Sequence, residues 1–194
     1  MGHVKKGGTI MILQLLTLRD SAFKNFSSSE KSHVQGGLVL LLTGLLYGSL
    51  LLIANRSYIL SFETPALKWA IVPLIFMVSG LMMAWLTRIG LTLVVWAGAR
   101  GFGGEGVMGR IRPFVSISLL PGLLAVPLLT GWQMNALGIV LATIGVFWML
   151  IFHWKTLQTT QQFSKVKAGI AAITVFVFFV SIYYLVVPTG AITS

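Results

Sequence analysis

The chain has 194 residues, of which 56% are hydrophobic and only 9% are charged. A soluble domain usually carries about 25% charged residues, whereas this chain has a mean hydropathy of +0.91 and apolar runs long enough to be membrane spans. The composition therefore excludes an ordinary soluble domain. The absence of cysteine excludes disulfides, thiolate metal sites and thiol nucleophiles. We assign the net charge of +10 to contact with anionic lipid headgroups and not with nucleic acid, because no soluble domain presents a basic face.

Residues 1–33 form a basic N-terminal tail with the pattern of an amphipathic helix. One helical face is apolar and consists of Ile12, Leu15, Leu16, Phe23 and Phe26. The opposite face is polar and consists of Gln14, Thr17, Ser21 and Lys24. We expect this helix to lie on an anionic membrane surface. A cleaved signal peptide is the alternative, since Lys5 and Lys6 precede the apolar run, but Gln14 interrupts that run and no small-residue cleavage site follows.

The rest of the chain, residues 34–194, is predicted to be an all-α bundle of about five transmembrane helices. The predicted spans cover about residues 36–54, 69–98, 113–130, 136–152 and 168–187. In the first span Gly44 and Gly48 form a small-xxx-small pair, which favours close helix packing within the bundle over a dedicated dimer face. The third and fourth spans form a helical hairpin around a tight turn at Thr130–Asn135, with a re-entrant hairpin as the alternative. Pro188–Ser194 is an uncharged tail.

The second predicted span, Trp69–Gly98, is too long for a bilayer. One helix of this length would reach about 45 Å, against a hydrocarbon core of about 30 Å, so the segment is either one long tilted helix or broken. It contains one charge, Arg88. Arg88 is interpreted either as an arginine that snorkels to the interface or as one inside the bundle that binds a lipid phosphate or a partner carboxylate. In both cases Ile89–Ala97 is an apolar overhang that must tilt, fold back or be covered.

Basic residues are distributed asymmetrically between the two sides that five spans define. The N-terminal tail, the loop after the second span and the connector after the fourth carry five, three and three basic residues, whereas the loop after the first span carries only Arg56 and Lys68. By the positive-inside rule the N-terminus is cytoplasmic and the C-terminus is outside. Four or six spans would put basic segments on the wrong side. We therefore expect a multi-pass protein of a cell membrane, the inner membrane of a bacterium.

A glycine-rich basic loop is predicted at Gly98–Arg112. Its residues Gly101–Gly106 match G-x-G-x-x-G, but a dinucleotide-binding fingerprint requires a preceding strand within a βαβ unit. Here the motif follows a membrane helix. Clustered glycines instead indicate a flexible, sharp reversal of the backbone.

No catalytic residue, metal site or cofactor is predicted. Asp20 is the only aspartate, which argues against metal-dependent headgroup transfer, and the three histidines lie in different segments. His153, beside Trp154, is interpreted as an interfacial residue at the start of a polar connector, His153–Lys167. The sequence indicates no intramembrane Ser–His pair and no paired carboxylates. Without an acid or histidine well inside a span, an ion-driven transporter is disfavoured.

Several segments together resemble the Ypt-interacting protein (Yip) family in its bacterial form, from about Leu13 to Val187. They are the amphipathic stretch Leu13–Phe26, the glycine-rich loop Gly101–Gly109, the Arg110–Pro113 element, Leu120-Pro121 in the third span, and Gln161–Ala168 before the last span. The resemblance implies a five-span, non-enzymatic membrane protein that acts through partners, in some relatives as an accessory subunit of ABC-type transporters. The Asp-Leu-Tyr-Gly-Pro element of eukaryotic members is absent, so the resemblance does not extend to Rab-type GTPase binding.

The leading functional hypothesis is a membrane subunit or scaffold that associates with other membrane proteins. The alternative is a permease or lipid-handling protein that uses Arg88 and the proline-broken third span, because Pro121 and Pro127 free backbone carbonyls that could line a path. A membrane enzyme lacks support. Candidate contacts with a partner or a lipid are Arg88, Trp96, Arg100, Arg110 and Arg112, and candidate helix-packing residues are Gly44 and Gly48.

Overall fold

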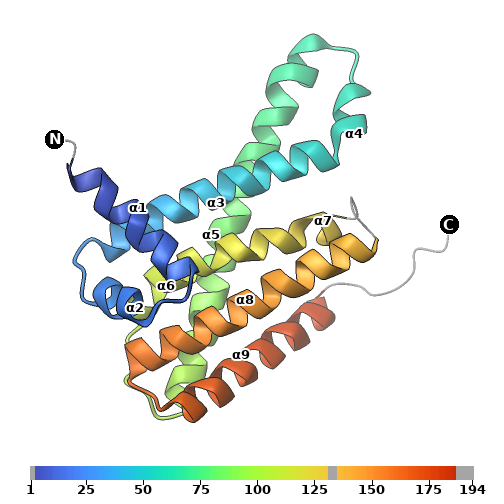
Figure 1. Cartoon of the computed structure of the whole chain (residues 1–194). Coiled ribbons are helices and arrows are strands. Elements are labelled where there is room, and N and C mark those ends of the chain that lie inside the picture. Colours follow the sequence, from blue (N-terminus) through green and yellow to red (C-terminus); the bar gives the residue numbers. More distant parts are fainter. Residues whose placement is uncertain (1–2, 131–134, 187–194) are drawn as a thin grey trace.

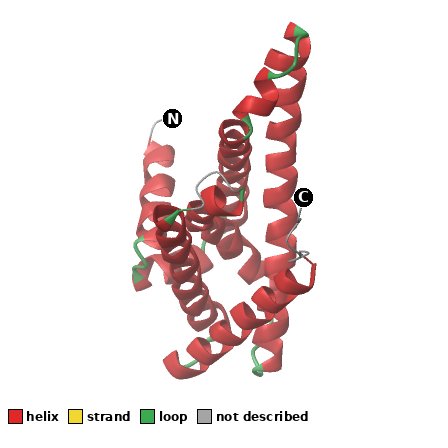
Figure 2. Cartoon of the chain, turned by 90° about the vertical axis from the view of Figure 1, so that its right-hand side faces the viewer, coloured by secondary structure: helices red, strands yellow, loops and turns green. Residues whose placement is uncertain are grey.

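The computed structural model describes residues 3–130 and 135–186, and these fold into helices without a strand (Figures 1 and 2). Most of the turn predicted at Thr130–Asn135 and the whole tail Pro188–Ser194 lie outside the described residues. The elements in chain order are α1 (His3–Leu16), α2 (Asp20–Ser27), α3 (Ser32–Ala54), α4 (Arg56–Leu60), the π-helical turn η1 (Leu67–Ile71), α5 (Val72–Gly101), α6 (Met108–Gly122), the 3-10 turn η2 (Leu123–Ala125), α7 (Val126–Leu129), α8 (Ala136–Gln161) and α9 (Lys165–Val186).

Among the described residues, four helical segments are long and apolar enough to cross a membrane. They are Ser32–Ala54, Leu67–Gly101, Met108–Leu129 and Ala136–Gln161. Each hydrogen-bonds its own backbone, which is the condition for crossing hydrocarbon. The described chain is therefore all-helical, with helices of the length and apolarity predicted for membrane spans. The segment predicted as a fifth span forms α9, a helix of 22 residues.

Two predicted connectors are shorter than expected because polar and glycine residues continue the helices. The connector expected at His153–Lys167 contributes a further two turns to α8, where Thr156 and Thr160 hydroxyls bond the carbonyls four residues earlier at 2.9 and 2.8 Å. Helix α8 ends only where Gln162 takes a left-handed conformation (φ 54°). The glycine-rich loop is likewise reduced to residues 102–107 between α5 and α6.

The second span is one long helix and not a broken one. With η1 it runs for 35 residues, about 52 Å of helix, and Figure 2 shows it extending along most of the height of the molecule. Its last turns are covered by the chain itself: Leu91, Val95 and Ala99 are at most 2% exposed and belong to a core shared with α6, α8 and α9. Of the alternatives for the apolar segment Ile89–Ala97, cover therefore applies to its inward face and comes from the chain's own helices, whereas Leu93 is 45% exposed.

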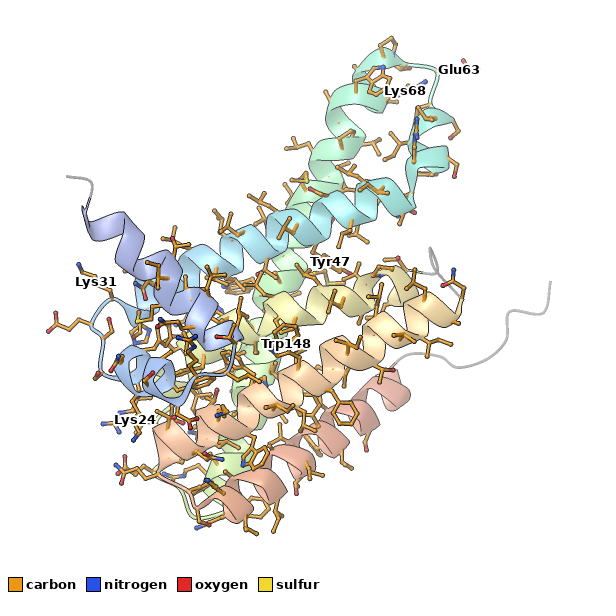
Figure 3. The ribbon with its side chains drawn as sticks, viewed as in Figure 1. Lys24, Lys31, Tyr47, Glu63, Lys68 and Trp148 are labelled. Atoms are coloured by element: carbon orange, nitrogen blue, oxygen red, sulfur yellow. The ribbon has the colours of Figure 1, made fainter. Side chains whose placement is uncertain are left out.

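The other half of α5 pairs with α3 to form an arm that projects beyond the remaining helices (Figure 1). We call residues 48–80 the arm. Glycines hold its two helices together. A Cβ atom on Gly80 of α5 would lie 2.4 Å from the Gly48 amide nitrogen and 2.6 Å from the Gly44 carbonyl oxygen of α3. Glu63 and Lys68 lie at the tip of the arm, at the opposite end of the molecule from Lys24 and Lys31 (Figure 3).

The N-terminal tail contains two helices and not one, since Leu18 takes a left-handed conformation (φ 59°) between α1 and α2. The apolar face of α2 packs against the bundle, where Phe23 and Phe26 are at most 1% exposed. The Phe23 ring stacks on Phe114 of α6 with centroids 5.6 Å apart. The Trp148 indole of α8 donates a hydrogen bond to the Leu16 carbonyl at 2.9 Å. The side chains expected to face the membrane surface are thus partly used to dock the tail on α6 and α8.

Replacement of Gly80 by alanine is expected to lower the free energy of unfolding by about 1–3 kcal/mol, the usual cost of overpacking. The new Cβ atom would meet backbone atoms of α3, which cannot rotate away as a side chain can. Thermal melting in mild detergent measures the loss. Gly90→Ala on the same helix is the matched control, because nothing lies within 4 Å of its Cβ position. Equal melting midpoints for the two variants would show that the contact is not tight.

An ion pair between Asp20 of α2 and Lys155 of α8 makes the docking of α2 sensitive to acid. The hydrogen bond and charge of Lys155 hold the pKa of the Asp20 carboxyl below its ordinary value of 3.8. A carboxyl whose pKa is lower in the folded state stabilises fully above pH 3.8, and this stabilisation is lost as the pH falls through the folded-state pKa. Asp20 is 78% exposed, so its contribution is below about 1 kcal/mol.

We therefore expect Asp20→Asn to lower the melting midpoint slightly at about pH 6 and to have no effect at about pH 2. Glu30→Gln is the control, because it removes an acid that forms no ion pair among the described residues. An effect of Asp20→Asn that is the same at both pH values would contradict the assignment.

Candidate functional site

The central feature of the candidate site is a buried arginine without a counterion. Arg88 lies in the middle of α5 and is only 8% exposed. The backbone carbonyl of Arg88 accepts a hydrogen bond from the Thr92 hydroxyl at 2.6 Å, but no described residue accepts one from its guanidinium, and its buried Nε is unpaired. A buried charged group is costly unless it is paired. Most of Arg88 is therefore packed within the bundle, and its Nε is enclosed there without a partner.

None of the four acidic residues of the chain neutralises Arg88. Asp20 pairs with Lys155, and Glu105 pairs with Arg110 at 3.3 Å. Glu63 lies at the tip of the arm (Figure 3). Glu30 is exposed and forms no ion pair among the described residues. Arg88 consequently has no internal carboxylate to bind.

A second arginine lies close to Arg88 and increases the local positive charge. Arg112 lies in the first turns of α6, a helix that packs against α5, and its charge repels that of Arg88. Arg112 is exposed, whereas the next residue, Pro113, packs against α3, where a Cβ atom on Gly36 would lie 3.0 Å from the Pro113 Cα. Arg88 and Arg112 thus come from two helices that pack against each other, and their charges interact.

The other candidate residues form a separate group around the loop at residues 102–107. The Trp96 indole donates a hydrogen bond to the Gly106 carbonyl at 2.6 Å, and the Gly106 amide donates to Gln161 Oε1 of α8 at 2.7 Å. Gly103 and Gly106 have positive φ values, 73° and 59°, which explains the glycine requirement. Arg100 Nη1 lies 3.4 Å from the Glu105 carbonyl, and Arg110 pairs with the Glu105 carboxylate.

The loop at residues 102–107 therefore reverses the chain direction and is held by the hydrogen bonds of Gly106 to Trp96 and Gln161. It is less flexible than its glycine content indicates. Sequence reasoning missed Gln161, which was assigned to a connector. The only available signal was its position in a polar segment, where one glutamine cannot be told from its neighbours. The structure brings Trp96, Arg100 and Arg110 together at the loop, and neither Arg88 nor Arg112 has a hydrogen bond there among the described residues.

A largely apolar cleft of about 320 Å³ lies next to the buried arginine. Helix α3 contributes Thr43 and Tyr47, and α5 contributes Ala84 and Thr87, the residue before Arg88. Figure 3 shows Tyr47 between α3 and α7. The remaining wall comes from the α6–η2–α7 segment, α8 and α9, and includes Leu119, Gly122, Leu123, Val126, Val146 and Phe179. All of the predicted spans therefore contribute to one cleft.

The prolines of the third span lie beside this wall in the sequence. Pro121 lies inside α6, directly before the change to the 3-10 turn η2, and Pro127 lies in the first turn of α7. The Pro121 carbonyl faces α8, where a Cβ atom on Gly145 would lie 2.6 Å from its oxygen.

His153 is buried between helices, whereas an ordinary interfacial residue is exposed to the headgroups. It is 1% exposed, its Nδ1 lies 2.8 Å from the Met149 carbonyl, and its Nε2 lies 3.4 Å from the Ser118 hydroxyl. Ser118 of α6 and His153 of α8 thus form a Ser–His contact that the sequence did not indicate. Ser118 is 0% exposed and its hydroxyl also donates to the Val115 carbonyl at 2.8 Å. This geometry is that of a polar contact between helices, because a nucleophile needs access to its substrate.

The described residues contain no group of three or more metal-binding side chains. We found no match to this chain among protein-family models, curated proteins or solved structures. The chemistry of the site must therefore be inferred from its geometry. A guanidinium beside an apolar cleft is a geometry suited to the recognition of an anion with an apolar part.

We expect Gln161→Leu to loosen the loop at residues 102–107. The variant leaves the Gly106 amide buried without an acceptor, which costs about 1–3 kcal/mol. Hydrogen exchange at Gly103–Gly106 should accelerate by at least about fivefold. Gln158→Leu, at a half-buried position one turn earlier, is the matched control. Unchanged exchange in Gln161→Leu would show that the clamp does not hold the loop.

Proposed function

We propose that this protein is a non-enzymatic, five-span membrane subunit that acts by docking against a transmembrane helix of another membrane protein. The N-terminus is cytoplasmic, and the membrane is the bacterial inner membrane. The asymmetry of basic residues and the 22-residue helix α9 support this topology. The resemblance to the Yip family supports the role of an accessory subunit.

The observation that carries the proposal is an apolar groove of about 360 Å³ on the outer side of the α3–α5 pair. Its floor contains Gly37, which has no atom within 4 Å of its Cβ position. Its walls are formed by Leu40 and Leu41 of α3 and by Leu81, Met82 and Trp85 of α5. Leu41, Met82 and Trp85 are 50–58% exposed.

A partner helix fits this groove better than lipid alone. Lipid tails solvate apolar side chains as well as protein does, so helices associate in membranes where small residues permit close contact. Gly44, Gly48 and Gly80 are already used within the chain, whereas Gly37 is open. Tryptophan and methionine, which flank it, are enriched at protein interfaces. The groove therefore has a small floor and large adaptable walls.

The proposal predicts that Gly37→Leu abolishes association with the partner while leaving the fold intact, because the leucine would fill the open groove. Purification from native membranes in mild detergent, followed by quantitative mass spectrometry, should recover one stoichiometric membrane protein with the wild type and less than about a tenth of it with the variant. Gly90→Leu is the matched control, since Gly90 is also a helix glycine with open space.

Two results would contradict this function. A monodisperse monomer without a partner would remove its basis. Partner recovery that is equal for Gly37→Leu and Gly90→Leu would exclude this groove as the docking surface. A homodimer sensitive to Gly37→Leu would reassign the groove to self-association.

A further inference from the structure

We propose that the bundle holds one anionic phospholipid, with its phosphate between Arg88 and Arg112 and one acyl chain in the cleft between α3, α5, α7 and α8. This site lies apart from the outer groove at Gly37 and does not depend on a partner protein.

The charge of Arg88 requires an anion. Its side chain is more than nine-tenths buried, its Nε is unpaired, and every acid of the chain is placed elsewhere. Arg112 adds a second positive charge nearby, which makes the pair less stable without an anion between them. Phosphate oxygens bind arginine by charge-assisted, often bidentate hydrogen bonds. One phosphate would bind both groups and remove their repulsion.

The cleft provides a place for the acyl chain of the same molecule. Ala84, one helical turn before Arg88 on the same face of α5, lines the cleft, and so does Thr87. Long side chains on helices lean toward the helix N-terminus, which directs Arg88 toward Ala84. Only Thr43, Tyr47 and Thr87 add hydroxyl groups to an otherwise apolar lining. An apolar tail therefore fits the lining, and a polar solute does not.

Along α6 and α7, the phosphate contact at Arg112 comes first and the acyl-chain cleft follows, which matches the orientation of a lipid in a membrane. Arg112 lies in the first turns of α6, on the same side of the bundle as the basic N-terminal helices. Leu119 and Val126 follow by about 10 and 21 Å of helix rise and both line the cleft. One leaflet of hydrocarbon is about 15 Å deep. The phosphate would thus lie at the predicted cytoplasmic interface, with the tail running toward the middle of the bilayer.

The test uses the full chain, delipidated in detergent, with added phosphatidylglycerol or phosphatidylcholine of identical acyl chains. Thermal melting and native mass spectrometry report binding. We expect phosphatidylglycerol to raise the melting midpoint and to remain bound as one molecule, and phosphatidylcholine to do neither. Inorganic phosphate alone should have no effect. Equal effects of the two lipids, or an equal effect of inorganic phosphate, would overturn the proposal.

Variants then locate the two parts of the site. Arg88→Gln should weaken phosphatidylglycerol binding by at least about tenfold, whereas Arg110→Gln, with the same charge change at an exposed ion pair, should not. If Arg88→Gln fails to fold, Arg112→Gln tests the same phosphate contact, because Arg112 is exposed.

The acyl-chain part of the site is tested separately. Val146→Trp narrows the cleft and should reduce lipid binding. Val140→Trp should not, because Val140 is an exposed residue of the same helix outside the cleft lining. Binding that survives Val146→Trp and whichever arginine variant folds would overturn the proposal.

Discussion

The close contact between the backbones of α3 and α5 is the constraint on which the rest of the structure depends. Lipid supplies no hydrophobic force between helices, so they associate through packing at short distance. Here Gly44 and Gly48 of α3 meet Gly80 of α5 with no room for a side chain. This contact fixes the arm, determines which face of α5 turns toward α6, and so places Arg88 inside the bundle. The cleft and the outer groove are the two sides of the same helix pair.

The membrane class and the approximate positions of the spans could be predicted from sequence, because apolar runs such as residues 36–54 have one physical explanation. Which face of each helix is buried could not be predicted from sequence, since α3, α5, α8 and α9 are apolar almost all round. His153 illustrates the consequence. Beside Trp154 it resembles an interfacial residue, and only the packing of α6 and α9 reveals that it is buried. The break at Leu18 was also hidden, because a single residue with positive φ leaves no periodic signal.

The residues of the candidate site could be predicted only in part, because local sequence patterns do not encode how the helices pack. Arg88 was recognisable as the one charge within a span, and the alternative that it lies inside the bundle was open from the start. Its proximity to Arg112 depends on how α6 crosses α5, which no local pattern encodes. Gln161 could not be found, because its role depends on the Gly106 amide, 55 residues earlier in the chain. Residues whose function is set by a distant backbone group are the ones that single-sequence reasoning misses.

The continuity of α5 has a mechanical consequence. The helix carries the arm at one end and the clamped glycine loop at the other, with its closest contact to α3 at Gly80 between them. From Gly80 to Gly101 the helix rises about 32 Å, and along this stretch Leu91, Val95 and Ala99 are packed into the core while the loop beyond is held by Gln161. The bundle therefore fixes one half of α5, so a displacement of the arm would bend the helix near Gly80 before it moved the loop.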